Sequence, residues 1–333
     1  MAKELAKFEE WPFKVPHIKS IIKKINALTA EFVAAASEEE AYKVSKKISR
    51  FGDKVYDEIT HVQVLYSLET TNPKYEKAMN TLNEGLPLIS AAQLAYTKAF
   101  VASPYRPYLE KKYGSFLFTM YEYQLKGFDE KIIPEATEEN KLVMQYEALI
   151  AGIQISFRGG SYNLPQMAKF TTDPDRATRK EARQAVDGAV NAKKDEIEGI
   201  YDKLVKVRTT MATKLGYKSF TELAYIRMNR FDYTPEMVAS YRDQIHDVVA
   251  PLANKLMREQ AKRTGIKTPK LYDLGFVFKS GNPLPLGTTD DKVAHAKEMY
   301  RALSPDTDYF FNFMADHHLL FLDAKPGNNR VAT

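Results

Sequence analysis

Residues 37–72 read SEEEAYKVSKKISRFGDKVYDEITHVQVLYSLETTN, and this stretch decides the class of the fold. Ser37 followed by Glu40 has the capping-box pattern that begins a helix. Asn72-Pro73 marks the end, because the residue before a proline is driven out of the helical conformation. Between these signals the sequence predicts one long helix.

The stretches on either side carry the same helical pattern. Pro16 suits the first position of a helix, and apolar residues follow it at helical spacing, namely Ile18, Ile21, Ile22, Ile25 and Leu28. Helices are also expected over residues 78–103, with a break or kink at Gly85 and Pro87, and over residues 134–153.

The second half of the sequence predicts longer helices. Asp173-Pro174 is expected to cap a very long helix over residues 175–216, with Gly216 at its end. Thr234-Pro235 starts another helix, which Pro251 is expected to bend.

One segment departs from this pattern. Residues 153–167, IQISFRGGSYNLPQM, place two short β-prone runs around Gly159-Gly160, which is the signal of a hairpin. The predicted fold is therefore mainly α, a multi-helical architecture with one short β-hairpin.

Composition excludes several classes of function. The chain has 333 residues, of which 44% are hydrophobic, so it can fill a large core. It has no cysteine, which excludes disulfides, thiolate metal sites and cysteine nucleophiles and favours the cytoplasm. No run reaches the length of a membrane span, and the net charge of +5 is scattered along the helices. Neither a membrane nor nucleic acid is indicated as a partner.

The six histidines do not predict a metal site. Two zinc-binding histidines on one helix need the spacing of H-E-x-x-H, and none of the six has it. We expect the adjacent His317 and His318 to be ordinary side chains of a helix. One should lie at the surface, and the other should be partly packed among Phe310, Phe311, Phe313 and residues 319–321.

Two other acid and histidine pairs are weak signals. Glu58 and His61 have the Glu-x-x-His spacing of a di-iron bundle, but no second copy exists, so a core or surface histidine is the better interpretation. Asp243 and His246 are interpreted as a surface contact between helical neighbours. Phosphate-binding glycine motifs and the G-x-S-x-G elbow are absent. The residues by themselves predict no catalytic site.

Three long segments resemble the oligoendopeptidase F group of the M3 family of zinc metallopeptidases. FRGGSYNLPQMAKFTTDPDRATRKEARQA, residues 157–185, resembles the family's hairpin and the D-R-x-x-R-K-x-A start of a helix. Residues 216–245 resemble its stretch around R-M-x-R-x-D-Y, and residues 278–327 resemble the segment that leads into its catalytic core. The resemblance is weakest before about Tyr105, where only helical character and length agree.

The resemblance implies a metallo-oligoendopeptidase that cleaves short peptides. In that family a zinc-bound water attacks the peptide bond, and the glutamate of H-E-x-x-H is the base. The motif follows the equivalent of LDAKPG, residues 322–327, whereas this sequence continues with NNRVAT and ends. The expectation is a chain truncated before its zinc motif and inactive alone. It has no catalytic and no metal-binding residue, it binds no zinc, and its substrate-binding residues are unknown.

The expected domains are a helical N-terminal cap over residues 1–172, with the hairpin near 153–165, and an incomplete catalytic domain over residues 173–333. The alternative function is a non-catalytic helical module that binds peptides or a partner protein. Self-association through the apolar end of the chain is expected in either case, because Phe310, Phe311 and Phe313 would lack cover there.

Overall fold

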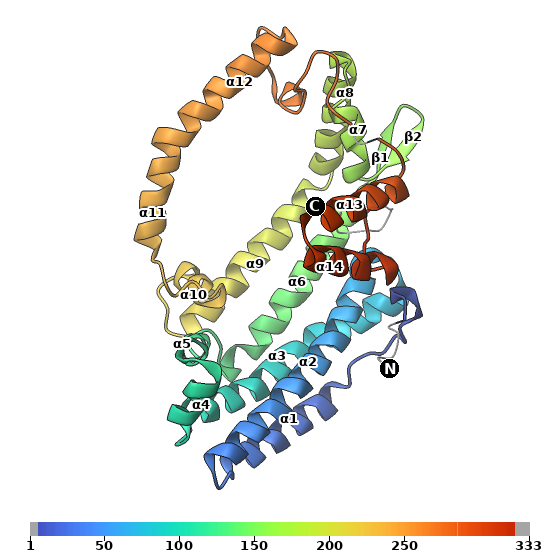
Figure 1. Ribbon diagram of the computed structural model, residues 1–333. Helices are drawn as coiled ribbons and strands as arrows, with labels where there is room; N and C mark the ends of the chain where they lie inside the picture. Colours follow the sequence, from blue (N-terminus) through green and yellow to red (C-terminus); the bar gives the residue numbers. More distant parts are fainter. Residues whose placement is uncertain (1–5, 285, 324–333) are drawn as a thin grey trace.

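The computed structural model describes residues 6–284 and 286–323 and is mainly α-helical with one hairpin, which confirms the predicted fold class (Figure 1). The first elements are η1 Phe8–Glu10, α1 Ile18–Val33, α2 Glu38–Leu68, α3 Pro73–Val101, α4 Arg106–Tyr113, α5 Ser115–Gln124, η2 Glu130–Ile132, α6 Ile133–Ala151, β1 Ile155–Phe157 and β2 Gly160–Tyr162. They are followed by η3 Pro165–Met167, α7 Ala168–Thr171, α8 Arg176–Asn191, α9 Lys194–Lys214, α10 Phe220–Arg227, α11 Pro235–Gln244, η4 Ile245–Val249, α12 Ala250–Thr264, η5 Leu271–Asp273, α13 Thr289–Leu303 and α14 Pro305–Asp316.

The helix predicted from residues 37–72 is α2. Ser37 is its N-cap, and its hydroxyl accepts a hydrogen bond from the Glu40 backbone N–H at 3.2 Å. Before α2, helix α1 begins at Ile18 with His17 as N-cap, so Pro16 lies outside the helix and not at its first position. The imidazole of His17 accepts from the Ser20 N–H and therefore does the capping.

Helix α3 runs without interruption through Gly85 and Pro87, so of the break or kink predicted there, a break does not occur. Helices α1, α2 and α6 all pack on α3, and this packing offsets the backbone hydrogen bond that Pro87 removes. The glycine at position 85 is explained by close packing between two helices. A Cβ at this position would lie 2.5 Å from the Ile18 side chain, so the glycine allows α1 to approach α3.

The predicted hairpin is confirmed, with β1 and β2 antiparallel and Ile155 opposite Tyr162. Arg158 and Gly159 form its turn, and both have positive φ, which gives the twist that suits a two-residue connection. Ile155, Phe157 and Met167 are buried there against α8.

The prediction of one long helix over residues 175–216 is wrong. This stretch forms two helices, α8 and α9, separated at Ala192-Lys193, because α8 packs on the hairpin whereas α9 packs on α6. The N-cap of α8 is Asp175, not Asp173-Pro174, and its carboxylate accepts from the Thr178 N–H at 2.8 Å.

Helices α11 and α12, joined by the π-helix η4, form a curved arm that stands apart from α6 and α9 over most of its length (Figure 1). Pro251, near the start of α12, has no N–H to donate to the preceding turn, and the helix widens to the π form just before it. A π-helical turn therefore precedes Pro251, where the sequence predicted a bend.

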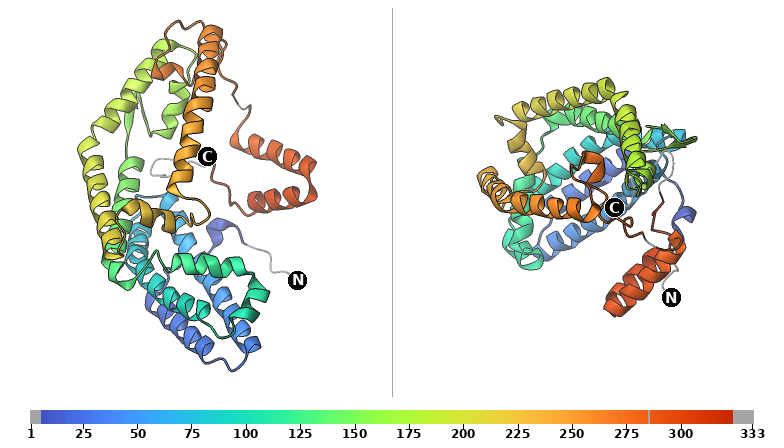
Figure 2. Two further views of the ribbon diagram at one scale, coloured as in Figure 1. Left: turned by 90° about the vertical axis from the view of Figure 1, so that its left-hand side faces the viewer. Right: turned by 90° about the horizontal axis from the view of Figure 1, so that it is seen from above.

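Helices α13 and α14 form a pair at the edge of the molecule (Figure 2). The N-terminal segment contacts the end of this pair. The Phe8 N–H donates to the His317 carbonyl at 3.0 Å, and the Phe8 ring lies 5.2 Å from the ring of Phe321. The expected departure at NNRVAT falls on residues 328–333, outside the described residues. The predicted self-association stays a prediction.

Candidate functional site

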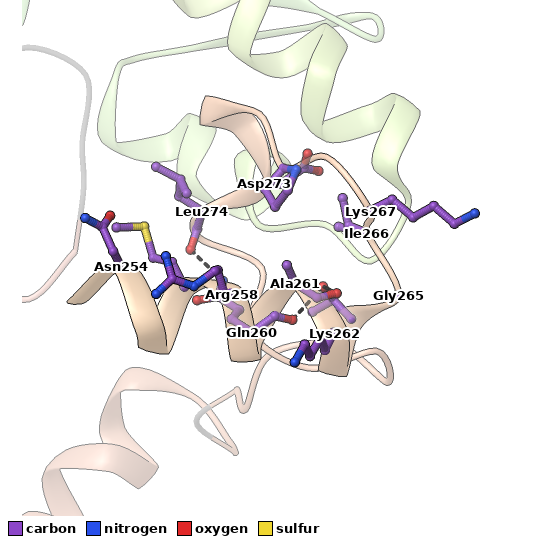
Figure 3. A pocket seen from close by; sticks show the side chains of 13 residues that line it. Asn254, Arg258, Gln260, Ala261, Lys262, Gly265, Ile266, Lys267, Asp273 and Leu274 are labelled. Atoms are coloured by element: carbon purple, nitrogen blue, oxygen red, sulfur yellow. Dashed lines mark hydrogen bonds between the residues drawn. The ribbon is translucent and has the colours of Figure 1, made fainter. Parts of the chain in front are cut away.

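A pocket of about 770 Å³ lies beside the end of α12, where the chain folds back (Figure 3). Gly265 adopts the left-handed conformation with φ of 75°, which ends α12 and reverses the chain. Gln260 holds the returning segment, because its side-chain amide donates to the carbonyls of Leu274 and Phe276 at 2.9 and 2.8 Å. Met257 and Ile266 give the pocket apolar walls.

Asp273 lines this pocket and connects it to α8. Its carboxylate accepts from Arg176 at 2.8 Å and from Arg179 at 2.9 Å, and from the Lys270 N–H at 2.9 Å. Burial by itself would raise the pKa of Asp273, but the hydrogen bonds from Arg176, Lys270 and Arg179 outweigh it and lower the pKa to about 2. The Arg179 guanidinium also lies 4.1 Å from the ring of Phe276. Asp273 is therefore a buried anion already neutralised by the protein.

A second buried carboxylate joins three helices below the arm. Glu139 of α6 accepts from Arg208 of α9 and from Arg227 of α10, each at 2.7 Å. Burial opposes the ionised form of Glu139, yet the hydrogen bonds and charges of the two arginines lower its pKa. Both arginines also lie near the face of Phe220, so α10, which precedes the arm, is fixed to the body.

The histidines are placed mostly as the sequence suggested. His317 caps the end of α14 against the Phe313 ring, half-buried, and His318 is exposed. Helix α14 ends at Asp316, so neither histidine is helical, and His318 has a φ of 56° that lets it bond Glu9 at 2.6 Å. Burial lowers the pKa of His61, which packs on Phe8 and Trp11.

One pairing prediction is wrong. His246 bonds Asp247 at 2.8 Å and not Asp243, because the π-helix η4 changes the angular spacing of side chains at this point. Within the described ranges 6–284 and 286–323, no three His, Asp or Glu side chains come together in a group that could hold a metal ion. The donors present there do not fit a zinc site. Over the same residues, no helix has both the length and the apolar content needed to cross a membrane.

Sequence reasoning missed both carboxylate and arginine groups. The sequence does carry one signal for the group around Asp273. Arg176 and Arg179 lie in the first turn of α8, where the helix dipole disfavours cations. Two arginines at such a position indicate an acidic partner, but the partner lies 94 residues from Arg179, and no local pattern identifies it. The pocket was not predicted either, because it lies between α12 and the segment that returns after Gly265.

The chain is similar to known proteins of one family. Residues 8–128 match the Peptidase M3 N-terminal domain, and residues 169–282 match Peptidase family M3. A crystal structure of a protein assigned as oligoendopeptidase F from Bacillus anthracis strain Ames shares 36% identity and a TM-score of 0.95, over 98% of this chain and 60% of that one. A second structure assigned as oligoendopeptidase F shares 34% identity and a TM-score of 0.95, over 97% of this chain and 57% of the other.

The structure titled Pz peptidase A with inhibitor 2 is similar at 35% identity, with a TM-score of 0.95, over 97% of this chain and 57% of that chain. The chain thus spans less than two thirds of the length of each of these proteins. Among curated proteins there is no significant match.

Proposed function

Since the chain belongs to peptidase family M3 and has the fold of its oligoendopeptidase F-like members, we propose that it forms the peptide-binding framework of a metal-dependent oligopeptidase. The observation that carries the proposal is the TM-score of 0.95 over 98% of the chain, at 36% identity, to a protein assigned as oligoendopeptidase F. The substrate class is short, unstructured peptides.

The role of this chain is to build and hold the walls around a peptide. Asp273 with its two arginines fixes the upper end of the arm to α8, and Glu139 with its two arginines fixes α10 at the lower end to α6 and α9. Such walls orient a substrate only if they keep their positions, and the two ion-paired carboxylates are what hold these ends of the arm in place.

The family relation implies a zinc ion that would supply the activated water for hydrolysis. The described histidines and carboxylates do not fit that ion, and H-E-x-x-H is absent from the sequence. We therefore assign no step of hydrolysis to any residue of this chain, and we propose that the chain by itself is inactive.

The test is hydrolysis of quenched fluorescent peptides of several lengths by the purified chain, with added zinc and with a chelator. We expect no hydrolysis above background in either condition. Addition of the region of the B. anthracis protein that this chain does not match, about 40% of that protein, should give peptide hydrolysis that the chelator abolishes. Cleavage by the chain alone that persists in chelator after stringent purification would refute the proposal.

A non-catalytic module that binds peptides or a partner protein is the second candidate, and the exposed apolar face of α11 favours it, with Met237 57% and Tyr241 62% exposed. Tight binding of unmodified peptides by the chain alone, with no hydrolysis after the complement is added, would favour this candidate. Under either function, we propose a boundary near residue 172 between an N-terminal cap and a catalytic-type domain, and a cytoplasmic location.

A further inference from the structure

The pocket beside the end of α12 combines apolar walls with a basic lining (Figure 3). Its volume of about 770 Å³ lies in the range of pockets that take small organic ligands. A ligand held here must offer an apolar part to the walls, which are formed by Met257, Ala261, Ile266, Pro269 and Leu274.

The charges around the pocket favour an anion. Arg258, Lys262 and Lys267 line it, and residues 254–270 hold six lysines and arginines against one glutamate, a net charge of +5. Asp273 is the acidic side chain among the described lining residues, and the arginines of α8 already neutralise it. It therefore does not cancel the positive potential that a ligand would meet.

Cations near the end of a helix have an ordinary explanation, which covers only part of this set. Lys262 and Arg263 lie in the last turn of α12, where they complement the helix dipole, and Arg263 also donates to the Val277 carbonyl at 2.9 Å. Arg258 lies earlier in the helix, and Lys267 lies beyond it. In the part of the chain that the structure describes, neither of these two side chains has an ion-pair or hydrogen-bond partner. Both remain available to a ligand.

The positions of these groups define the shape of the ligand. Figure 3 shows Asn254 and Arg258 toward one end of the pocket and Lys267 at the other. A ligand that contacts both cations must be elongated, with an acidic group at each end and an apolar part between them. The Arg258 guanidinium suits a carboxylate, and the Asn254 amide can both donate to and accept from a peptide group.

We propose that this pocket binds short peptides in which acidic side chains flank aliphatic ones. Single-stranded nucleic acid, the other elongated anion, fits less well, because the described lining has no aromatic side chain on which a base could stack. The inference goes beyond the proposed function, since it concerns equilibrium binding at a separate site and needs neither hydrolysis nor a metal ion.

The experiment titrates the 333-residue chain by calorimetry, in chelator, with the peptide Glu-Leu-Leu-Glu blocked at both ends. The blocked peptide Gln-Leu-Leu-Gln has the same shape without the charges, and suberate has two carboxylates and an aliphatic chain without amide groups. Arg258→Gln and Lys267→Gln each remove one cation of the pocket. Lys255→Gln is the matched control, because it removes an exposed charge of α12 outside the lining. Circular dichroism checks that the variants fold like the parent.

We expect saturable one-to-one binding of the acidic peptide that weakens as the salt concentration rises. Arg258→Gln and Lys267→Gln should each weaken it by about threefold or more, and Lys255→Gln by less than about 1.5-fold. Equal losses in the three variants, or equal affinity for the neutral peptide, would overturn the proposal. So would suberate or a thymidine oligonucleotide that binds more tightly than the peptide and depends on the same two cations.

Discussion

Asp273 and Arg179 form a buried ion pair, with Arg179 Nη2 2.9 Å from Asp273 Oδ1 and each side chain 1% exposed. The pair joins the segment after α12 to the first turn of α8, although 94 residues separate the two partners along the chain. Arg176 contacts the same carboxylate but is 48% exposed. The two arginines therefore differ in what their removal should cost.

Asp273→Asn should destabilise the protein by about 3–5 kcal/mol, because it leaves the Arg179 guanidinium buried without its counter-charge. Urea unfolding followed by circular dichroism measures this free energy. Arg176→Ala is the control and should cost much less, since water screens its charge. Equal losses in the two variants would show that burial of the pair has no energetic consequence.

The ionised Asp273 carboxylate should also make the free energy of unfolding depend on pH. The pKa of Asp273 is lowered from 3.8 to about 2, so the unfolded chain takes up the proton more readily than the folded one. The stabilisation is therefore present above the unfolded pKa and is lost as the pH falls toward about 2. We expect the difference in unfolding free energy between the parent and Asp273→Asn to shrink over that range. A difference that does not change with pH would contradict the ionised state of Asp273.

Glu139→Gln should also destabilise, by about 1–3 kcal/mol, because Arg208 and Arg227 lose a shared anion but remain partly in water. The Glu139 side chain is 6% exposed, whereas the arginines are 35% and 38% exposed. Glu110→Gln is the matched control, because Glu110 is 33% exposed in its pair with Arg106 and should cost less than about 1 kcal/mol. A denaturant titration should show a larger loss of unfolding free energy for Glu139→Gln than for Glu110→Gln, and the reverse order would contradict the prediction.

Phe8→Ala should loosen α13 and α14 from the body. Phe8 is 8% exposed, and its ring lies 5.3 Å from His61 and 5.2 Å from Phe321. The substitution should cost about 3 kcal/mol and speed hydrogen exchange in residues 305–321. Phe310→Ala removes a ring that is 63% exposed and should cost less than about 0.5 kcal/mol. Unchanged exchange in Phe8→Ala would mean that other contacts hold the pair.

Local signals in the sequence predicted most of the fold. Ser37 and Thr234 act as N-caps where the capping patterns indicated, and the Gly159 turn forms the hairpin. These features depend on residues within a few positions of each other, so a pattern can detect them. The division of α8 from α9 could not be predicted in this way, because it depends on which distant element each helix packs against.

The candidate site was harder to predict than the fold, for the same reason. Asp273 and Glu139 lie far along the chain from their arginines, and the sequence around each acid is ordinary. The adjacent His317 and His318 instead have structural contacts: His317 caps the end of α14 beside Phe313, and His318 bonds Glu9. The adjacent histidines are therefore less informative than Arg176 and Arg179, whose position at a helix start indicates an acidic partner.

Gly85 and Gly52 give the last prediction, because both lie within long helices and only one has a close neighbour. A Cβ at Gly85 would lie 2.5 Å from the Ile18 side chain, whereas a Cβ at Gly52 would meet nothing within 4 Å. Gly52→Ala should therefore stabilise by about 0.5–1 kcal/mol through helix propensity alone. Gly85→Ala should instead destabilise by about 1–3 kcal/mol, because α1 must move away from α3.

A double-mutant cycle with Ile18→Ala tests the cause of this difference. If the clash with Ile18 is responsible, Gly85→Ala should cost much less in the Ile18→Ala background, with a coupling free energy of about 1 kcal/mol or more. Gly52→Ala should have the same effect in both backgrounds, since it does not touch Ile18. Additive free energies for Gly85 and Ile18 would show that the clash with Ile18 is not the cause of the loss in Gly85→Ala.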